Sequence, residues 1–242
     1  SMALQLVPEL HGATATEQLA QCMAKTPGQV QALLLGALAA RQDVAARGAV
    51  QAALSSADPA VRLAALKSLG TLGDATSVKL LVDRTGADVP PAERDAARNS
   101  LVHLRGPRIN EVLIGLLSQD DASRQAELIR ILAARSAVSS LPALEKAAEA
   151  ADATVRKEAW KALGSLARTP DAAALLELLV RARDEDRDDA EKAVGAVLGR
   201  PDRPDMRAVL QKLETVETPA ARGSLIRLVS AVGDDSALPA LR

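Results

Sequence analysis

The sequence predicts an all-α protein, a right-handed solenoid in which pairs of antiparallel helices stack one on the next. One observation behind this prediction is composition. The 242-residue chain contains no Phe and no Tyr, and Trp160 is its single Trp, so its core has to be built from Ala, Leu and Val. Ala and Leu favour helices, and the aromatic residues that favour strands are nearly absent. The other observation is a sequence motif that recurs at nearly constant spacing, which is typical of repeat architectures.

The recurring motif is clearest from Asp58 to Asp74, and a second copy runs from Asp152 to Leu166. Arg62 anchors the first copy, and equivalent positions follow at spacings of 32, 30, 32, 31 and 35 residues: Arg94, Arg124, Arg156, Arg187 and Arg222. An apolar residue stands seven positions after each anchor and another stands ten positions after it, which is the spacing of one helix face. The first set is Leu69, Leu101, Ile131, Leu163, Val194 and Val229, and the second is Leu72, Leu104, Ala134, Leu166, Val197 and Val232.

Each unit then turns and begins a second helix. Turns such as Gly73-Asp74 and Gly106-Pro107 hold residues that end one helix and start the next. Asp58-Pro59 places Pro in the first turn of a helix, where its missing N–H costs nothing. The second helices are expected to carry one core leucine each, at Leu81, Leu113, Leu144, Leu175, Leu210 and Leu241.

The units have to stack into one continuous core, because a single pair of short helices cannot bury its own apolar faces. The sequence therefore predicts a single domain over residues 1–242. Within it, residues 1–27 form a helical lead-in, 28–57 a degenerate repeat, and 58–242 six clearer repeats, of which the last is truncated. No polar capping helix follows that repeat, so we expect the natural protein to continue beyond Arg242.

These repeats resemble the HEAT-repeat family, and in particular the bacterial repeats described as phycobilisome-lyase-like. The resemblance covers nearly the whole chain and implies an α-solenoid of about seven helix pairs. It also extends to the HEAT segments of large, often exported, multidomain bacterial proteins, so the chain is expected to be a segment of such a protein. It is specific for fold and weak for function, because this repeat serves many unrelated roles.

The charge balance argues against a polyanionic partner. With 30 basic and 31 acidic residues the net charge is −1, which leaves no field to steer nucleic acid or an anionic membrane. No apolar run is long enough to span a bilayer. The sequence is therefore that of a soluble protein, with no signal-peptide pattern at its start. Ser1-Met2 resembles the remainder of a protease site, so a native signal could have been removed and the compartment is left open.

Few residues suggest a catalytic, metal-binding or base-binding site. Members of the family that hydroxylate a lysine hold iron with repeated His-Glu pairs, and this sequence has none at the matching positions. His11 and His103 are far apart and are interpreted as surface or groove residues. Members that excise alkylated bases rely on a basic groove with aromatic residues, whereas Trp160 is interpreted as a packed core residue. No enzymatic activity, metal or cofactor is predicted.

Two further features receive structural interpretations. The acidic run from Asp184 to Asp189 begins like a calcium loop, but Asp189 stands where Gly is required and Gly195 where Glu is required. It is interpreted as a solvated cap at the start of a helix. Cys22 excludes an intrachain disulfide because it is the only cysteine, and it is interpreted as a half-buried structural residue.

The second helices are expected to line a concave groove, the usual binding surface of solenoids. Along this row the charge alternates at Asp83, Lys146, Glu177 and Lys212, which suits a protein or peptide, or a neighbouring domain of the same chain. A simply solvated row explains the same pattern. The predicted function is a non-catalytic interaction or scaffolding module. The alternative is an accessory domain or subunit of an enzyme, such as a bilin lyase or a secreted oxidoreductase, whose chemistry lies elsewhere. The oligomeric state is left open.

Overall fold

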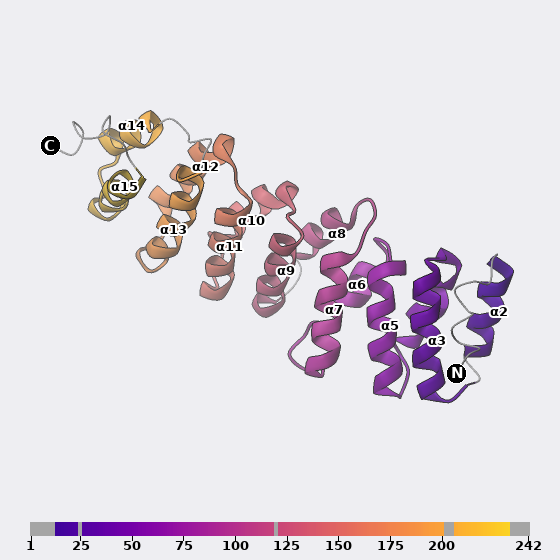
Figure 1. Cartoon of the computed structure of the whole chain (residues 1–242). Helices are drawn as coiled ribbons and strands as arrows, with labels where there is room; N and C mark the ends of the chain where they lie inside the picture. The colour runs from indigo at the N-terminus through magenta and orange to yellow at the C-terminus, as the bar shows by residue number, and fades with distance from the viewer. Residues whose placement is uncertain (1–12, 24–25, 119–120, 201–205, 233–242) are drawn as a thin grey trace. The chain divides into compact units, whose positions relative to one another are not determined.

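A computed structural model describes residues 13–23, 26–118, 121–200 and 206–232. Every regular element in these ranges is helical, which confirms the predicted fold class (Figure 1). By its contacts the chain divides into two compact units, Ser1–Leu116 and Leu117–Arg242. Each unit is a series of helix pairs of the kind that forms an α-solenoid. The grouping of all repeats into a single domain stays a prediction.

In the N-terminal unit the longer first helices α3, α5 and α7 run alongside one another, with α5 packed between the other two (Figure 1). The short second helices α4 and α6 pack against α5 and α7 respectively. The α-helices of this unit are α2 (Ala13–Met23), α3 (Gly28–Arg41), α4 (Arg47–Ala53), α5 (Pro59–Leu72), α6 (Ser77–Val82), α7 (Pro91–His103) and α8 (Ile109–Leu116). The pair α3 and α4 occupies the segment predicted to be a degenerate repeat.

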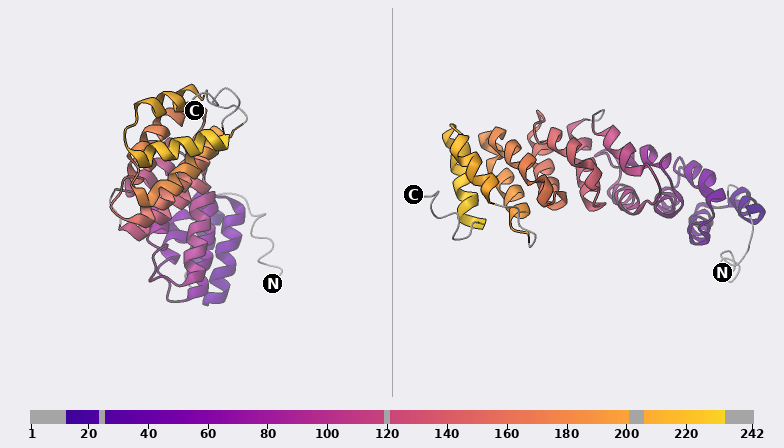
Figure 2. Two further views of the ribbon diagram at one scale, coloured as in Figure 1. Left: turned by 90° about the vertical axis from the view of Figure 1, so that its left-hand side faces the viewer. Right: turned by 90° about the horizontal axis from the view of Figure 1, so that it is seen from above.

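The C-terminal unit repeats the same plan. Here α11 packs between α9 and α13, and α13 also packs against α15, so that the first helices again lie side by side (Figure 2, pink to yellow). Short 3-10 turns lead into three of its helices, at Val138–Ser140 (η3), Thr169–Asp171 (η4) and Asp184–Asp186 (η5). The α-helices are α9 (Ala122–Ala134), α10 (Leu141–Ala147), α11 (Ala153–Leu166), α12 (Ala172–Arg181), α13 (Arg187–Leu198), α14 (Arg207–Thr215) and α15 (Pro219–Val232).

Aspartates start the first helices of three pairs. The Asp58 carboxylate accepts a hydrogen bond from the Ala60 N–H at 2.8 Å, and Pro59 follows in the first turn. Asp152 accepts from the Thr154 N–H at 2.8 Å, and Asp121 accepts from the Arg124 N–H at 3.0 Å. Each aspartate accepts a hydrogen bond from an N–H that has no partner inside its helix. This explains why the motif begins with Asp in its clearest copies.

The predicted apolar stripe forms the core. All six residues that stand seven positions after an anchor are buried, and so are Leu72, Leu104, Leu166 and Val197 in the second set. Ala134 was expected there too but is exposed, because α9 ends at that residue. The side chain of Val232 lies outside the described residues. The periodicity therefore identified the buried face of the first helices correctly, except where a helix ends.

The core positions of the second helices also match the prediction, except in α14, where the buried face is displaced by one residue. Leu81, Leu113, Leu144 and Leu175 are all buried. Leu210 is only half-buried, so its assignment as the core position of α14 was wrong. The face of α14 that is buried carries Met206, Val209, Leu213 and Val216. This unit is longer than the others, and extrapolation across it landed one residue away from the buried face. Leu241 lies outside the described residues.

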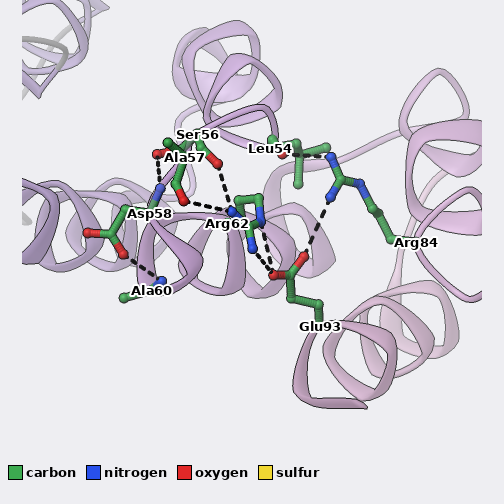
Figure 3. A network of polar contacts seen from close by, with 8 residues as sticks. All are labelled: Leu54, Ser56, Ala57, Asp58, Ala60, Arg62, Arg84 and Glu93. Atoms are coloured by element: carbon green, nitrogen blue, oxygen red, sulfur yellow. Dashed lines mark hydrogen bonds and ion pairs between the residues drawn. The ribbon is translucent and has the colours of Figure 1, made fainter. Parts of the chain in front are cut away.

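The anchor Arg62 joins its own pair to the next one (Figure 3). Its Nε donates to Oε1 of Glu93 on α7 at 2.9 Å, and its Nη2 donates to the same oxygen at 2.6 Å. Its Nη1 donates to the carbonyls of Ser56 and Ala57 at 2.9 and 3.0 Å. Glu93, whose side chain is 4% exposed, also lies 3.5 Å from Nη1 of Arg84. The buried carboxylate is thus balanced by two guanidinium groups.

Arg156 makes a corresponding set of bonds in the C-terminal unit, with two carboxylates in place of one. Its Nε donates to Asp186 at 2.6 Å, its Nη2 donates to Glu185, and its Nη1 donates to the carbonyls of Ala150 and Ala151 at 3.2 and 2.7 Å. Its side chain is 1% exposed, and that of Asp186 is 9% exposed. Each of these two anchors therefore bonds a carboxylate that directly precedes the anchor position of the following repeat.

Candidate interaction surface

The four charged residues predicted to form a binding row lie at or near the ends of second helices. Asp83 directly follows α6, Lys146 lies in the last turn of α10, Glu177 lies on α12 and Lys212 on α14. Asp83, Lys146 and Glu177 are exposed, and Lys212 is half-buried. Asp83 belongs to the N-terminal unit and the other three to the C-terminal unit. Their role in binding stays a prediction.

The structure brings two of these residues together. Lys212 donates from its Nζ to Glu177, which joins α14 to α12. Asp83 lies 4.0 Å from Nζ of Lys79, one helical turn earlier. Lys146 forms no ion pair within the described part of the chain. The alternation of charge that the sequence shows is therefore used in part inside the molecule, between neighbouring second helices.

The same use of charge recurs at other junctions between helix pairs. Ion pairs join Arg47 to Asp74, Arg130 to Glu158, Arg181 to Glu149 and Arg227 to Glu191. The hydrogen bonds from Arg227 hold the pKa of Glu191 below its ordinary value, against the opposing effect of burial. A hydrogen bond from the Thr76 hydroxyl, at 2.6 Å, similarly lowers the pKa of Asp74. Both carboxylates are therefore charged at neutral pH, where they keep their ion pairs with Arg227 and Arg47.

A cavity of about 230 Å³ lies among α10, α11 and α12. Its apolar walls are Ala148 at the end of α10 and Leu178 and Ala182 at the end of α12, together with Trp160 of α11. Its polar groups are Glu149, Arg181 and Arg183. Sequence reasoning did not find this cavity, because its lining comes from three segments that only the fold brings together. The one signal available was the presence of a single Trp in a chain without Phe or Tyr.

Trp160 has the buried position that the sequence predicted. It is 1% exposed, and its Nε1 is buried without a hydrogen-bond partner. A Trp usually finds a partner for this N–H when it is buried. An unpaired buried donor costs free energy, which makes it a feature that calls for an explanation.

His103 lies on the surface, as predicted for it, with its Nδ1 2.8 Å from the Asn99 carbonyl. His11 lies outside the described residues. Cys22 is exposed, so its interpretation as a half-buried structural residue was wrong. The next residue, Met23, is the one that is buried on this face of α2. One position along a helix turns a side chain by more than a quarter of a turn, and no repeated apolar position near Cys22 shows which face of this helix is buried.

The acidic run is not the simple solvated cap that the sequence suggested. Asp186 is buried against Arg156, Glu185 binds the same guanidinium group, and Asp184 accepts from Arg187 at 2.9 Å. Only its last two members fit the expected place in the first turn of α13. The run departs from the prediction because its first residues form a 3-10 turn that faces the preceding repeat.

The described residues hold neither a metal-binding cluster nor a helix suited to spanning a membrane. They contain no group of three or more His, Cys, Asp or Glu side chains arranged to hold a metal ion. None of their helices combines the length and apolar character that crossing a bilayer requires.

A family model for HEAT repeats matches residues 16–102 and again residues 109–195, which together cover most of the chain. The chain belongs to the HEAT-repeat family. This confirms the resemblance and the predicted fold, while the narrower likeness to bacterial phycobilisome-lyase repeats and the expectation of a larger parent protein stay predictions. No curated protein matches the chain.

Two solved structures are similar to this HEAT-repeat chain. One is human deoxyhypusine hydroxylase in complex with glycerol, with 19% sequence identity over 96% of this chain and 88% of that one, and a TM-score of 0.39. The other is an engineered protein, with 21% identity over 91% of this chain and 68% of that one, and a TM-score of 0.43. Both identities are low, and neither likeness bears on function.

Proposed function

We propose that this HEAT-repeat chain is a non-catalytic interaction or scaffolding module that binds a protein or peptide, or a neighbouring domain, along its second helices. Repeats of this kind present extended surfaces that suit protein partners. The observation that supports the proposal most directly is the C-terminal unit, where exposed charge on α10 and α12 lies on the same helices whose ends line a cavity. A polar rim around a recess is the usual anatomy of a protein-binding surface.

The test uses charge reversal with a matched control. The row variant reverses the four second-helix charges and leaves the net charge unchanged: Asp83→Lys, Lys146→Glu, Glu177→Lys and Lys212→Glu. It also preserves the ion pair between α12 and α14, because both of its partners are exchanged. The control variant reverses four exposed charges on first helices, again with no change in net charge: Lys67→Glu, Asp95→Lys, Asp188→Lys and Lys192→Glu.

Proteins captured from extracts of the source cells by the wild type and both variants are compared by quantitative mass spectrometry. The row variant is expected to lose a specific partner by roughly tenfold, because reversed charges repel a surface that had matched them. The control variant is expected to keep that partner. Equal capture by all three proteins, or equal loss with both variants, would contradict the assignment to the second helices.

A further inference from the structure

The cavity among α10, α11 and α12 is rich in hydrogen-bond donors. Trp160 forms part of its wall, and the Nε1–H of this 1% exposed side chain is itself buried without a partner. The guanidinium group of Arg183 is exposed and binds no side chain in the described part of the protein. Arg181 adds further N–H groups. A ligand for this cavity therefore has to supply hydrogen-bond acceptors.

Charge in the cavity points to an anionic ligand. Glu149 is its single acidic side chain, and it is paired with Arg181 at 3.1 Å. Arg183 then carries the positive charge that is not balanced within the cavity. Both guanidinium groups lie at the end of α12, since Arg181 is its last residue and Arg183 is two residues beyond it. The ion pair of Glu149 is half-exposed, so it can rearrange at little cost when a second carboxylate enters.

The size of the cavity favours a side chain over a small-molecule ligand. Its volume of about 230 Å³ is below the range of about 300 to 1,000 Å³ that is usual for cofactor and small-molecule sites. Its apolar walls, formed by Ala148, Leu178 and Ala182, suit the methylene groups of an acidic side chain. A carboxylate on a short apolar stem fits both the volume and the polarity.

We propose that this cavity binds the carboxylate of a Glu or Asp side chain from an acidic peptide segment of the partner. Arg183 supplies the charge-assisted hydrogen bonds to the carboxylate, and the Trp160 ring forms part of the apolar wall beside it. This inference rests on the proposed function and narrows it, since it gives the partner a chemical character. None of the four row residues lines the cavity, so the two proposals can be tested separately.

The single Trp makes the test direct, because the protein has one indole N–H and therefore one indole signal in its nitrogen–proton NMR spectrum. The probes are two short, capped peptides, one of alternating Ala and Glu and the other of alternating Ala and Gln. The acidic peptide is expected to shift the indole signal in a saturable way that weakens with added salt. The neutral peptide is expected to leave the signal in place.

The variant Arg183→Glu removes the unbalanced positive charge from an exposed position and is not expected to disturb folding. Its affinity for the acidic peptide should fall by roughly tenfold, the usual cost of losing a charge-assisted hydrogen bond. The matched control is Arg222→Glu, which makes the same change at an exposed arginine on α15 that does not line the cavity. The control should bind as the wild type does.

The proposal is overturned if the indole signal does not respond to the acidic peptide, or if the neutral peptide shifts it equally. It is also overturned if Arg183→Glu and Arg222→Glu bind with the same affinity. None of these results affects the proposed function, which is decided by the capture experiment with the row variant. Loss of partner capture by the row variant together with a silent indole would mean that the partner binds elsewhere on the second helices.

Discussion

Trp160→Ala is expected to lower the free energy of unfolding of the C-terminal unit by about 3 to 5 kcal/mol, the usual cost of truncating a buried Trp. The side chain is 1% exposed and packs within the core cluster of that unit. Nothing near it can fill the space, because the rest of the core consists of Ala, Leu and Val together with Ile129 and Met206. Denaturant titration followed by far-ultraviolet circular dichroism measures the effect.

Two further variants show whether the loss comes from packing. Trp160→Phe keeps most of the buried surface and removes an N–H that has no partner, so it should cost only roughly 1 to 2 kcal/mol. Leu33→Ala truncates a side chain that is 56% exposed and should change stability by less than about 0.5 kcal/mol. A Trp160→Ala protein as stable as the Leu33→Ala protein would show that the indole does not support the core.

Arg156→Met is expected to destabilise the C-terminal unit by about 3 to 5 kcal/mol, because it leaves the buried carboxylate of Asp186 without its partner. The carbonyls of Ala150 and Ala151 lose their donor in the same step. Hydrogen exchange measured by mass spectrometry should show faster exchange in α11 and α13 than in the wild type. The helices α3 and α5, which belong to the N-terminal unit, should keep their protection.

The double variant Arg156→Met with Asp186→Leu separates the two sources of this loss. Replacing both partners by apolar residues removes the buried charge and should restore most of the stability. Arg94→Met is the control at the equivalent anchor, where the side chain is only half-buried and forms no ion pair in the described structure. It should cost less than about 1 kcal/mol. A loss of equal size at Arg94 would show that the anchor acts through packing and not through Asp186.

The fold could be predicted because the repeat imposes the same physical requirement many times. The same position of the motif holds Leu69, Leu101 and Leu163. Each is buried because a helix pair has no other way to cover its apolar face. Prediction failed where the repeat spacing is least regular or the repeats have not yet begun. Leu210 lies within the longest spacing between anchors, from Arg187 to Arg222, and Cys22 lies before the first clear copy, so the buried face of the helix could not be extrapolated to either residue.

The arginine bonds could be predicted only in part. The sequence located Arg62 and Arg156 but missed their carboxylates, although a signal was present: Glu93 and Asp186 each directly precede the next anchor. The other anchors show why this was hard to see. Ser123, Val155 and Ala221 stand at the corresponding place, so the pairing holds for only some repeats. A rule with so few instances does not stand out from chance in a single sequence.

The interaction surface was predictable in outline and not in detail. The row of charges on the second helices follows from the repeat register, but the pairing of Glu177 with Lys212 depends on the distance between neighbouring helices. The cavity at Trp160 depends on where α10 and α12 end relative to α11. Helix ends are the least regular part of a repeat, and the sequence fixes them poorly.

Site-specific photo-crosslinking shows whether the second helices form the binding surface. A photoreactive residue is placed at Lys146 on α10, at Glu177 on α12, or at Lys157 and Lys192 on the first helices α11 and α13. All four positions are exposed. We expect the captured partner to be crosslinked from Lys146 and Glu177 and not from Lys157 or Lys192. Crosslinks that arise mainly from the first-helix positions would place the partner on the first helices and overturn the proposed function.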